Sequence, residues 1–86
     1  MSFWLGKVCR EAREQREIKR VHIAARLDVN EQTIGRFEAG RPSRDQDLVV
    51  AAYGDVLGLD ARELWLDAAR RYYEEGKRPT LKAMRP

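Results

Sequence analysis

Along most of the chain, apolar residues recur three or four positions apart, with charged residues between them. This is the period of an amphipathic α-helix, and the runs of alternating β-branched residues that mark strands are absent from the sequence. The pattern predicts an all-α domain whose five helices cover about 3–16, 20–27, 31–38, 43–57 and 60–75. The apolar stripes of the first three helices are expected in the core: Leu5, Val8, Cys9, Ala12, Ile23, Ala24, Leu27, Ile34 and Phe37.

Turn and capping residues mark the ends of these helices. Asn30 is a good N-cap for the third helix because its side chain can accept a hydrogen bond from a free backbone N–H. Gly40 is expected to end that helix, and Asp28 tolerates a left-handed turn just before it. The segments 43–46 (Ser-Arg-Asp-Gln) and 60–63 (Asp-Ala-Arg-Glu) are capping-box patterns, which predict the starts of the fourth and fifth helices.

The fourth and fifth helices differ in the number of their apolar stripes. The fourth has one stripe, formed by Leu48, Val49, Ala52, Val56 and Leu57. The fifth has a first stripe with Leu64, Trp65, Ala68 and Tyr72, and a neighbouring stripe with Leu66, Ala69 and Tyr73. A helix that packs on one side only would not need both.

The surplus stripe of the fifth helix predicts an interface with another chain. Aromatic residues are favoured in such interfaces. Most oligomers are homodimers with two-fold symmetry. A homodimer is therefore expected to use Trp65, Leu66, Ala69, Tyr72 and Tyr73. Alternatively, this surface could bind a different protein, such as an effector or a toxin.

Length and composition limit the class of protein. Eighty-six residues make a single domain, expected at 1–76 and followed by a basic tail at 77–86. No apolar run approaches the roughly 20 residues of a membrane span, and the N-terminus lacks the apolar core of a signal peptide. One cysteine, Cys9, and one histidine, His22, leave neither an internal disulfide nor a Cys/His metal site. We therefore expect a cytoplasmic protein without metal, cofactor or small-molecule ligand.

Charge is unevenly distributed along the chain. Residues 1–44 carry a net charge of +4, residues 45–75 carry −5, and residues 76–86 carry +4. The basic first half could meet a polyanion, or its charges could merely solvate a small helical protein. The basic tail is open to the same two interpretations, phosphate contact or a solvated end.

Two short helices joined by a three-residue turn, between Ile18 and Gly40, predict a helix-turn-helix. In that motif the second helix enters the major groove of DNA, where base edges carry a readable pattern of donors and acceptors. The short polar residues expected on the outward face of this helix are Gln32, Thr33, Gly35 and Arg36.

The segment from Ile18 to Gly40 resembles the lambda repressor and Cro type of helix-turn-helix, the XRE family. The matching marks are Ile23-Ala24 with Leu27 and Val29, the run from Thr33 to Glu38 with Gly40, and Leu57-Gly58-Leu59 followed by Glu63-Leu64. The resemblance covers roughly residues 5–66 and implies a five-helix, lambda-repressor-like DNA-binding domain. The chain departs from the family pattern at Glu17 and Asp28, where glycine is frequent, and at Lys19-Arg20, where Ser-Gln is frequent.

Base readout is expected from four side chains. Glutamine can bond adenine, and arginine guanine, through two hydrogen bonds each, so Gln32 and Arg36 are candidates. Glu31 could accept a hydrogen bond from N4 of cytosine. Alternatively, its negative charge could be stabilised by the positive N-terminal end of the helix dipole, or it could hold Arg20 or Arg36 in position. The resemblance places Arg20 where family members touch both backbone and base. Ordinary solvent exposure is the alternative for these residues.

Phosphate contacts are expected from polar and basic residues around the two short helices: Lys19, Asn30, Thr33, Arg41 and Arg44. Lys19 lies where the second helix starts, and in this motif that end approaches the sugar–phosphate backbone. Asn30 has a second interpretation as a pure N-cap. The resemblance also implies a structural ion pair between Arg13 and Glu38, which would fix the angle of the recognition helix.

Together these features favour a sequence-specific regulator that binds a two-fold double-stranded DNA operator as a dimer, similar to Cro or a short immunity repressor. Two alternatives stay open: the antitoxin of a toxin–antitoxin pair, and a protein-interaction adaptor that keeps the fold without binding DNA. An enzyme is not expected, because no motif brings a nucleophile, a base and an orienting acid together. Cys9 is expected in the core, with a redox sensor as the alternative.

Overall fold

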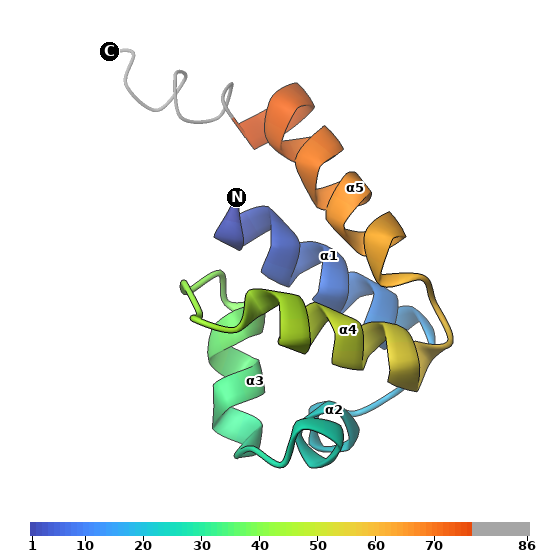
Figure 1. Cartoon of the computed structure of the whole chain (residues 1–86). Helices are drawn as coiled ribbons and strands as arrows, with labels where there is room; N and C mark the ends of the chain where they lie inside the picture. Colours follow the sequence, from blue (N-terminus) through green and yellow to red (C-terminus); the bar gives the residue numbers. More distant parts are fainter. Residues whose placement is uncertain (77–86) are drawn as a thin grey trace.

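The computed structural model describes residues 1–76, and these residues form helices and turns without a strand (Figure 1). The elements are α1 (Ser2–Gln15), α2 (Arg20–Leu27), α3 (Glu31–Glu38), α4 (Gln46–Leu57), α5 (Ala61–Arg71) and a π-helical segment η1 (Tyr72–Gly76). The predicted all-α class, with five helices, is confirmed. The predicted basic tail, 77–86, lies outside the described residues.

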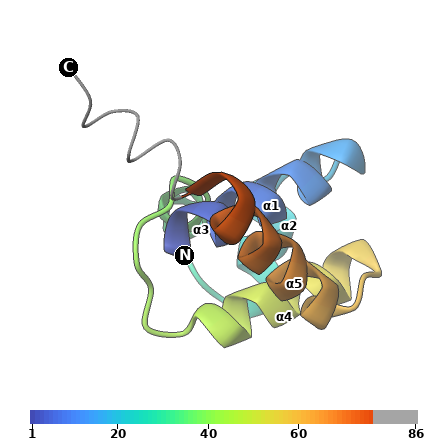
Figure 2. The same ribbon diagram turned by 90° about the horizontal axis from the view of Figure 1, so that it is seen from above.

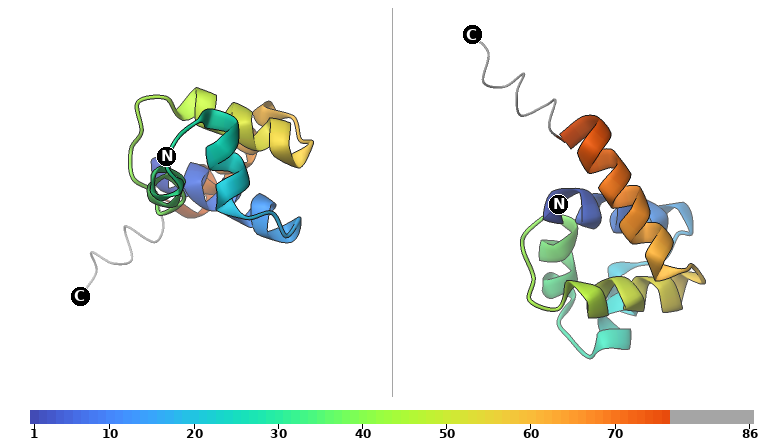
Figure 3. Two further views of the ribbon diagram at one scale, coloured as in Figure 1. Left: turned by 90° about the horizontal axis from the view of Figure 1, so that it is seen from below. Right: turned by 45° about the horizontal axis from the view of Figure 1, so that its top comes forward.

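Two helices form the centre of the domain. α1 packs against α3, α4 and α5, and α4 packs against α1, α2 and α5. Consequently α5 covers one side of α1 and α4, while α2 and α3 lie at the opposite end of the molecule (Figures 1 and 2). Figure 3 shows this end from below, with α2 and α3 side by side.

A single cluster of buried side chains joins all five α-helices. Its members are Leu5, Val8, Cys9, Ile23, Ala24, Ile34, Phe37, Val49, Val50, Ala52, Tyr53, Leu57, Leu64 and Ala68. Burying a branched aliphatic or aromatic side chain contributes about 1.5–3 kcal/mol, so this cluster holds even the two eight-residue helices in place.

The turn between α2 and α3 follows the expected chemistry. Asp28 adopts the left-handed conformation, with φ 56°. The Asn30 side chain accepts a hydrogen bond from the backbone N–H of Gln32 at 2.8 Å, which makes Asn30 the N-cap of α3. Gly40 follows α3 with φ 92°, and a Cβ there would lie 2.9 Å from the Cα of Phe3. These residues therefore define both ends of α3.

Glu17 also takes a left-handed conformation, with φ 55°, in the turn between α1 and α2. The family that the sequence resembles often has glycine at this position and at that of Asp28. A left-handed conformation costs an ordinary residue about 1–2 kcal/mol, so the backbone path is kept here at some expense of stability.

The predicted start of α4 was wrong, and so was the place of Leu48 in its buried stripe, although Val49, Ala52 and Leu57 are buried as expected. The helix begins at Gln46 after Asp45, and the capping box expected from Ser43 does not form. Instead, the Gln46 side-chain amide donates to the hydroxyl of Ser2 at 2.9 Å, linking the start of α4 to that of α1. Leu48 is 57% exposed. The fully buried positions are Val50 and Tyr53, because α4 lies between other helices and buries a wider face than one stripe.

The fifth helix agrees better with its pattern. The Asp60 carboxylate accepts the backbone N–H of Arg62 at 2.9 Å and caps α5. Its inner stripe is buried at Leu64 and Ala68, and its outer stripe is exposed at Leu66 and Tyr73. In the described part of the chain, no helix is both long and apolar enough to cross a membrane.

Candidate nucleic-acid interface

The two faces of α3 have different chemistry. Ile34 and Phe37 point into the core, whereas the side chains of Gln32, Thr33 and Arg36 are exposed. The period of 3.6 residues per turn produces this division, because positions 34 and 37 lie on one side and positions 32, 33 and 36 on the other. An amide, a hydroxyl and a guanidinium therefore share an outward face that can offer both donors and acceptors.

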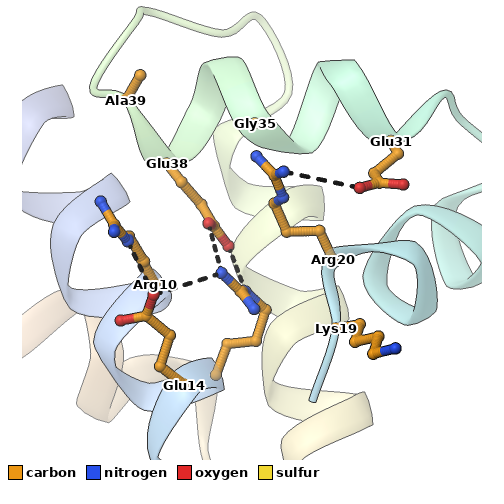
Figure 4. A pocket seen from close by; sticks show the side chains of 9 residues that line it. Arg10, Glu14, Lys19, Arg20, Glu31, Gly35, Glu38 and Ala39 are labelled. Carbon is orange, nitrogen blue, oxygen red and sulfur yellow. Dashed lines mark hydrogen bonds and ion pairs between the residues drawn. The ribbon is translucent and has the colours of Figure 1, made fainter. Parts of the chain in front are cut away.

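Arg20, at the start of α2, lies over the first turns of α3. Its Nη2 is 3.7 Å from a carboxylate oxygen of Glu31 (Figure 4). Its Nη1 lies only 2.8 Å from where a Cβ of Gly35 would be. The missing side chain of Gly35 thus makes room for the guanidinium. The structure brings Arg20 and Glu31 together, and Gly35 gains a role that the sequence analysis missed.

A groove of about 570 Å³ runs between α1, α2 and α3. The groove residues are Arg10, Arg13, Glu14, Lys19, Arg20, Glu31, Gly35, Glu38 and Ala39. Figure 4 shows that most of these charges face one another as ion pairs, while Lys19 extends away from them. Lys19 is exposed, at the edge of the helix-turn-helix.

The ion pair between Arg13 and Glu38 lies at the inner end of this groove. Arg13 donates from Nε and Nη2 to the two carboxylate oxygens of Glu38, at 2.7 and 2.9 Å, and from Nη1 to the carbonyl of Ile18, at 2.8 Å. The Glu38 side chain is only 4% exposed. Its hydrogen bond raises the pKa of the Arg13 guanidinium. This is the pair that the family resemblance implies, and it joins α1 to the last residue of α3.

Tyr53 of α4 extends this pair, and the sequence analysis did not find it. Its ring packs against Phe37 with centroids 5.7 Å apart, and its hydroxyl donates to the Oε2 of Glu38. Burial and this hydrogen bond raise the pKa of the Tyr53 hydroxyl. A signal was present, because Tyr53 lies four residues after Val49 and four before Leu57, on the inward face.

The remaining predicted phosphate contacts lie around α3. Arg41 and Arg44 are exposed in the loop after the carboxyl end of α3. The Asn30 oxygen is occupied by the capping hydrogen bond, in agreement with the N-cap interpretation. Arg20 lies beside the first turns of α3, and Lys19 lies next to Arg20 in the chain, at the edge of the groove.

The predicted dimer residues lie on α5 and η1, far from α2. Leu66 and Tyr73 are 69% and 70% exposed, whereas Trp65 packs partly against the core. Ala69 and Tyr72 are partly buried, and the rings of Tyr72 and Tyr73 meet edge to face with centroids 5.3 Å apart. The exposed apolar area is therefore centred on Leu66 and Tyr73.

The described residues contain no group of three or more histidine, cysteine, aspartate or glutamate side chains that could hold a metal ion. Cys9 is fully buried, and burial, together with the charge of Glu38, raises its thiol pKa to about 12. Since the thiolate is the reactive form of cysteine, this environment opposes a role in redox sensing.

Comparison with known families supports the geometry. A family model described as a helix-turn-helix domain matches residues 4–65, which include every residue that lines the groove. No curated protein and no solved structure matches the chain. The match is consistent with the lambda-repressor type of helix-turn-helix, a family that is typically non-enzymatic. Such a domain suggests a regulator that binds DNA. The chain belongs to the helix-turn-helix domain family.

Proposed function

We propose that this protein is a sequence-specific transcriptional regulator, similar to Cro or a short immunity repressor, that binds a two-fold operator as a homodimer. The observation that carries the proposal is the outward face of α3, where Gln32, Thr33 and Arg36 are exposed between flanking basic residues. An α-helix fits the major groove, and these side chain types form the specific contacts found there.

Base readout is assigned to Gln32 and Arg36, with Arg20 as a third reader. Each good two-bond contact contributes roughly 1–3 kcal/mol of discrimination. Glu31 lies 3.7 Å from Arg20, so its main role is to hold that guanidinium against α3. The carboxylate can also accept from N4 of cytosine, which keeps Glu31 among the base readers.

Contacts with DNA phosphates would fix the position and orientation of the protein along the duplex. Lys19 is exposed at the edge of the groove between α1, α2 and α3, and Arg41 and Arg44 follow the carboxyl end of α3. Thr33 and the free amide of Asn30 add polar contacts between them. A repressor of this kind acts by occupying the operator, which excludes polymerase from the promoter.

The dimer is assigned to the outer stripe of α5, centred on Leu66 and Tyr73, with Trp65, Ala69 and Tyr72 at its edge. Binding to a two-fold operator requires that the dimer present its two copies of α3 about 34 Å apart. The same exposed stripe also favours a second candidate function, the antitoxin of a toxin–antitoxin pair, in which a toxin would cover α5. A second protein that co-purifies in a fixed ratio would point to this alternative.

The first experiment is selection of bound duplexes from a random DNA pool at about 150 mM salt. Enrichment of a two-fold motif with half-site centres about 10 base pairs apart is the expected result. Enrichment of a single half-site would contradict the dimer. Absence of any enriched motif would contradict sequence-specific binding and favour a protein-interaction adaptor.

A further inference from the structure

Tyr53 is the largest side chain that is completely buried in the described residues, yet it is polar. Its hydroxyl donates to Oε2 of Glu38, the same oxygen that accepts from Nε of Arg13. Burying a hydroxyl without a partner is costly, so this hydrogen bond determines whether tyrosine is tolerated here at all. A phenylalanine would fill the same volume without that constraint.

Glu38 is therefore held from two separate helices. Arg13 reaches it from α1 and Tyr53 reaches it from α4, and both carboxylate oxygens are occupied. Because Glu38 is the last residue of α3, these bonds act directly on the recognition helix. The apolar anchors of α3, Ile34 and Phe37, restrain its depth in the core but have no directional preference comparable to a hydrogen bond.

The rotation of α3 decides where its outward side chains point. Each residue turns the helix by 100°, so Arg36 lies about 200° and Gln32 about 240° around the axis from Glu38. If α3 rotates about its axis so that the Glu38 carboxylate moves within the core, Gln32 and Arg36 on the opposite side rotate by the same angle. Because α3 has only eight residues, hydrogen bonds at its last residue act within two turns of both Gln32 and Arg36.

On this geometry, and resting on the proposed DNA-binding function, we propose that Tyr53 is a positioning residue for base readout. Its hydroxyl, acting through Glu38, fixes the rotation of α3 and hence the direction of Gln32 and Arg36. Tyr53 touches no DNA in this arrangement. Its loss should reduce discrimination between base sequences more than it reduces binding to DNA in general.

The test compares Tyr53→Phe with Val50→Ala. The first change removes only the hydroxyl. The second removes buried methyl groups from the same helix, one turn earlier, and leaves the hydrogen bonds of Glu38 intact. It therefore controls for a general loss of stability in α4. Both variants are studied as full chains, well below their melting temperatures.

The first readout is the ratio of affinities for the duplex enriched by the wild-type chain and for a scrambled duplex of equal length. We expect Tyr53→Phe to lower this ratio by about tenfold, with little change in affinity for the scrambled duplex. Val50→Ala should leave the ratio within about twofold. An unchanged ratio in Tyr53→Phe, or an equal decrease in both variants, would overturn the proposal.

The second readout needs no DNA and so separates this inference from the proposed function. Amide hydrogen exchange reports local opening of each helix in the free chain. Tyr53→Phe should speed exchange in α3 by about tenfold more than in α5, whereas Val50→Ala should affect both helices alike. If the wild-type chain enriches no duplex, the proposed function fails, and the exchange data still decide whether Tyr53 restrains α3. Equal acceleration in both helices would show that it does not.

Discussion

α3 and α5 are both amphipathic helices on the outside of the domain, but their outer faces are opposite in character. The outer face of α3 presents an amide, a hydroxyl and a guanidinium, whereas Leu66 of α5 and Tyr73 of the following η1 expose apolar side chains. A hydrated, charged partner such as DNA matches the first surface. An apolar protein surface matches the second. We propose that the domain uses one of these faces to bind DNA and the other to associate with a protein.

The anchors of the two helices differ in the same way. α3 is held by a buried network in which Glu38 accepts from Arg13 and Tyr53. α5 is tied to α1 by a more exposed ion pair, in which Arg71 lies 2.8 Å from Glu11. Buried hydrogen bonds specify orientation, whereas exposed ion pairs contribute little. The helix that we propose reads DNA bases is thus the one held by directional hydrogen bonds.

The largest expected effect comes from breaking the buried anchor of α3. Glu38→Ala leaves the guanidinium of Arg13 and the hydroxyl of Tyr53 without their acceptor, and should lower the free energy of unfolding by about 3–5 kcal/mol. Denaturant unfolding measures this difference. The matched control is Asp55→Ala, which removes an ion pair with Arg26 whose side chains are both 57% exposed. It should cost less than about 1 kcal/mol. Equal losses in the two variants would contradict the contrast between buried and exposed pairs.

Alkaline pH should lower the free energy of unfolding of the whole domain without any mutation. The thiol pKa of Cys9 is about 12 in the folded chain and 9.0 when unperturbed, so the folded state holds this proton more tightly. Stability is therefore fully present below pH 9 and is lost as pH rises from 9 toward 12, by up to about 4 kcal/mol. The raised pKa of Tyr53 acts in the same direction.

Unfolding measured between pH 8 and 11 checks this expectation, with Cys9→Ala as the comparison. The variant should lose part of the pH dependence, because it lacks the titrating thiol. A wild-type free energy of unfolding that stays constant over this range would refute the proposed burial of the Cys9 proton.

Discrimination by α3 should depend on Arg36. Arg36→Ala is expected to lose roughly 1–3 kcal/mol of preference at one base position while binding to unrelated DNA persists. Competition with duplexes that differ at single positions measures this loss. The control, Arg62→Ala, removes the same charge from α5 and should not change the preference at any base position. If Arg36→Ala weakens all sequences equally, Arg36 contacts phosphate only.

Self-association should depend on the outer stripe of α5. A substitution in this stripe should have the smallest effect on the free energy of unfolding. Because Leu66 is 69% exposed, Leu66→Asp should change the free energy of unfolding by no more than about 0.5 kcal/mol while lowering dimerisation. Sedimentation equilibrium measures the association. Leu48→Asp is the matched control, since Leu48 is 57% exposed on α4. Loss of the dimer in the control, or its persistence in Leu66→Asp, would place the interface elsewhere.

The sequence predicted the helices well because local signals mark them. The 3.6-residue period identified all five, and Asn30, Asp60 and Gly40 act at the helix ends where they were expected. Ser43 failed as a cap because Gln46, its supposed reciprocal partner, bonds to Ser2, 44 residues away in the chain. The residues 43–46 by themselves cannot predict a contact with a residue so far away in the chain.

The outward residues of α3 could be named from the sequence alone, since periodicity assigns Gln32, Thr33 and Arg36 to one face once Ile34 and Phe37 are placed inside. Periodicity does not say which charged residues meet. The pairing of Arg20 with Glu31 over Gly35, and the hydroxyl of Tyr53 at Glu38, join residues from different helices. These contacts follow from how the helices cross.

By itself, then, the amino-acid sequence determined the helices, their apolar faces and the polar character of the helix expected in the major groove. These properties depend on neighbours within one or two turns. The family resemblance implied the ion pair between Arg13 and Glu38, but only the tertiary structure showed that the Tyr53 hydroxyl joins it, that Leu48 is exposed, and which side chain holds Arg20. The reason is physical: burial and ion pairing depend on distances between helices, and packing of the whole core sets those distances.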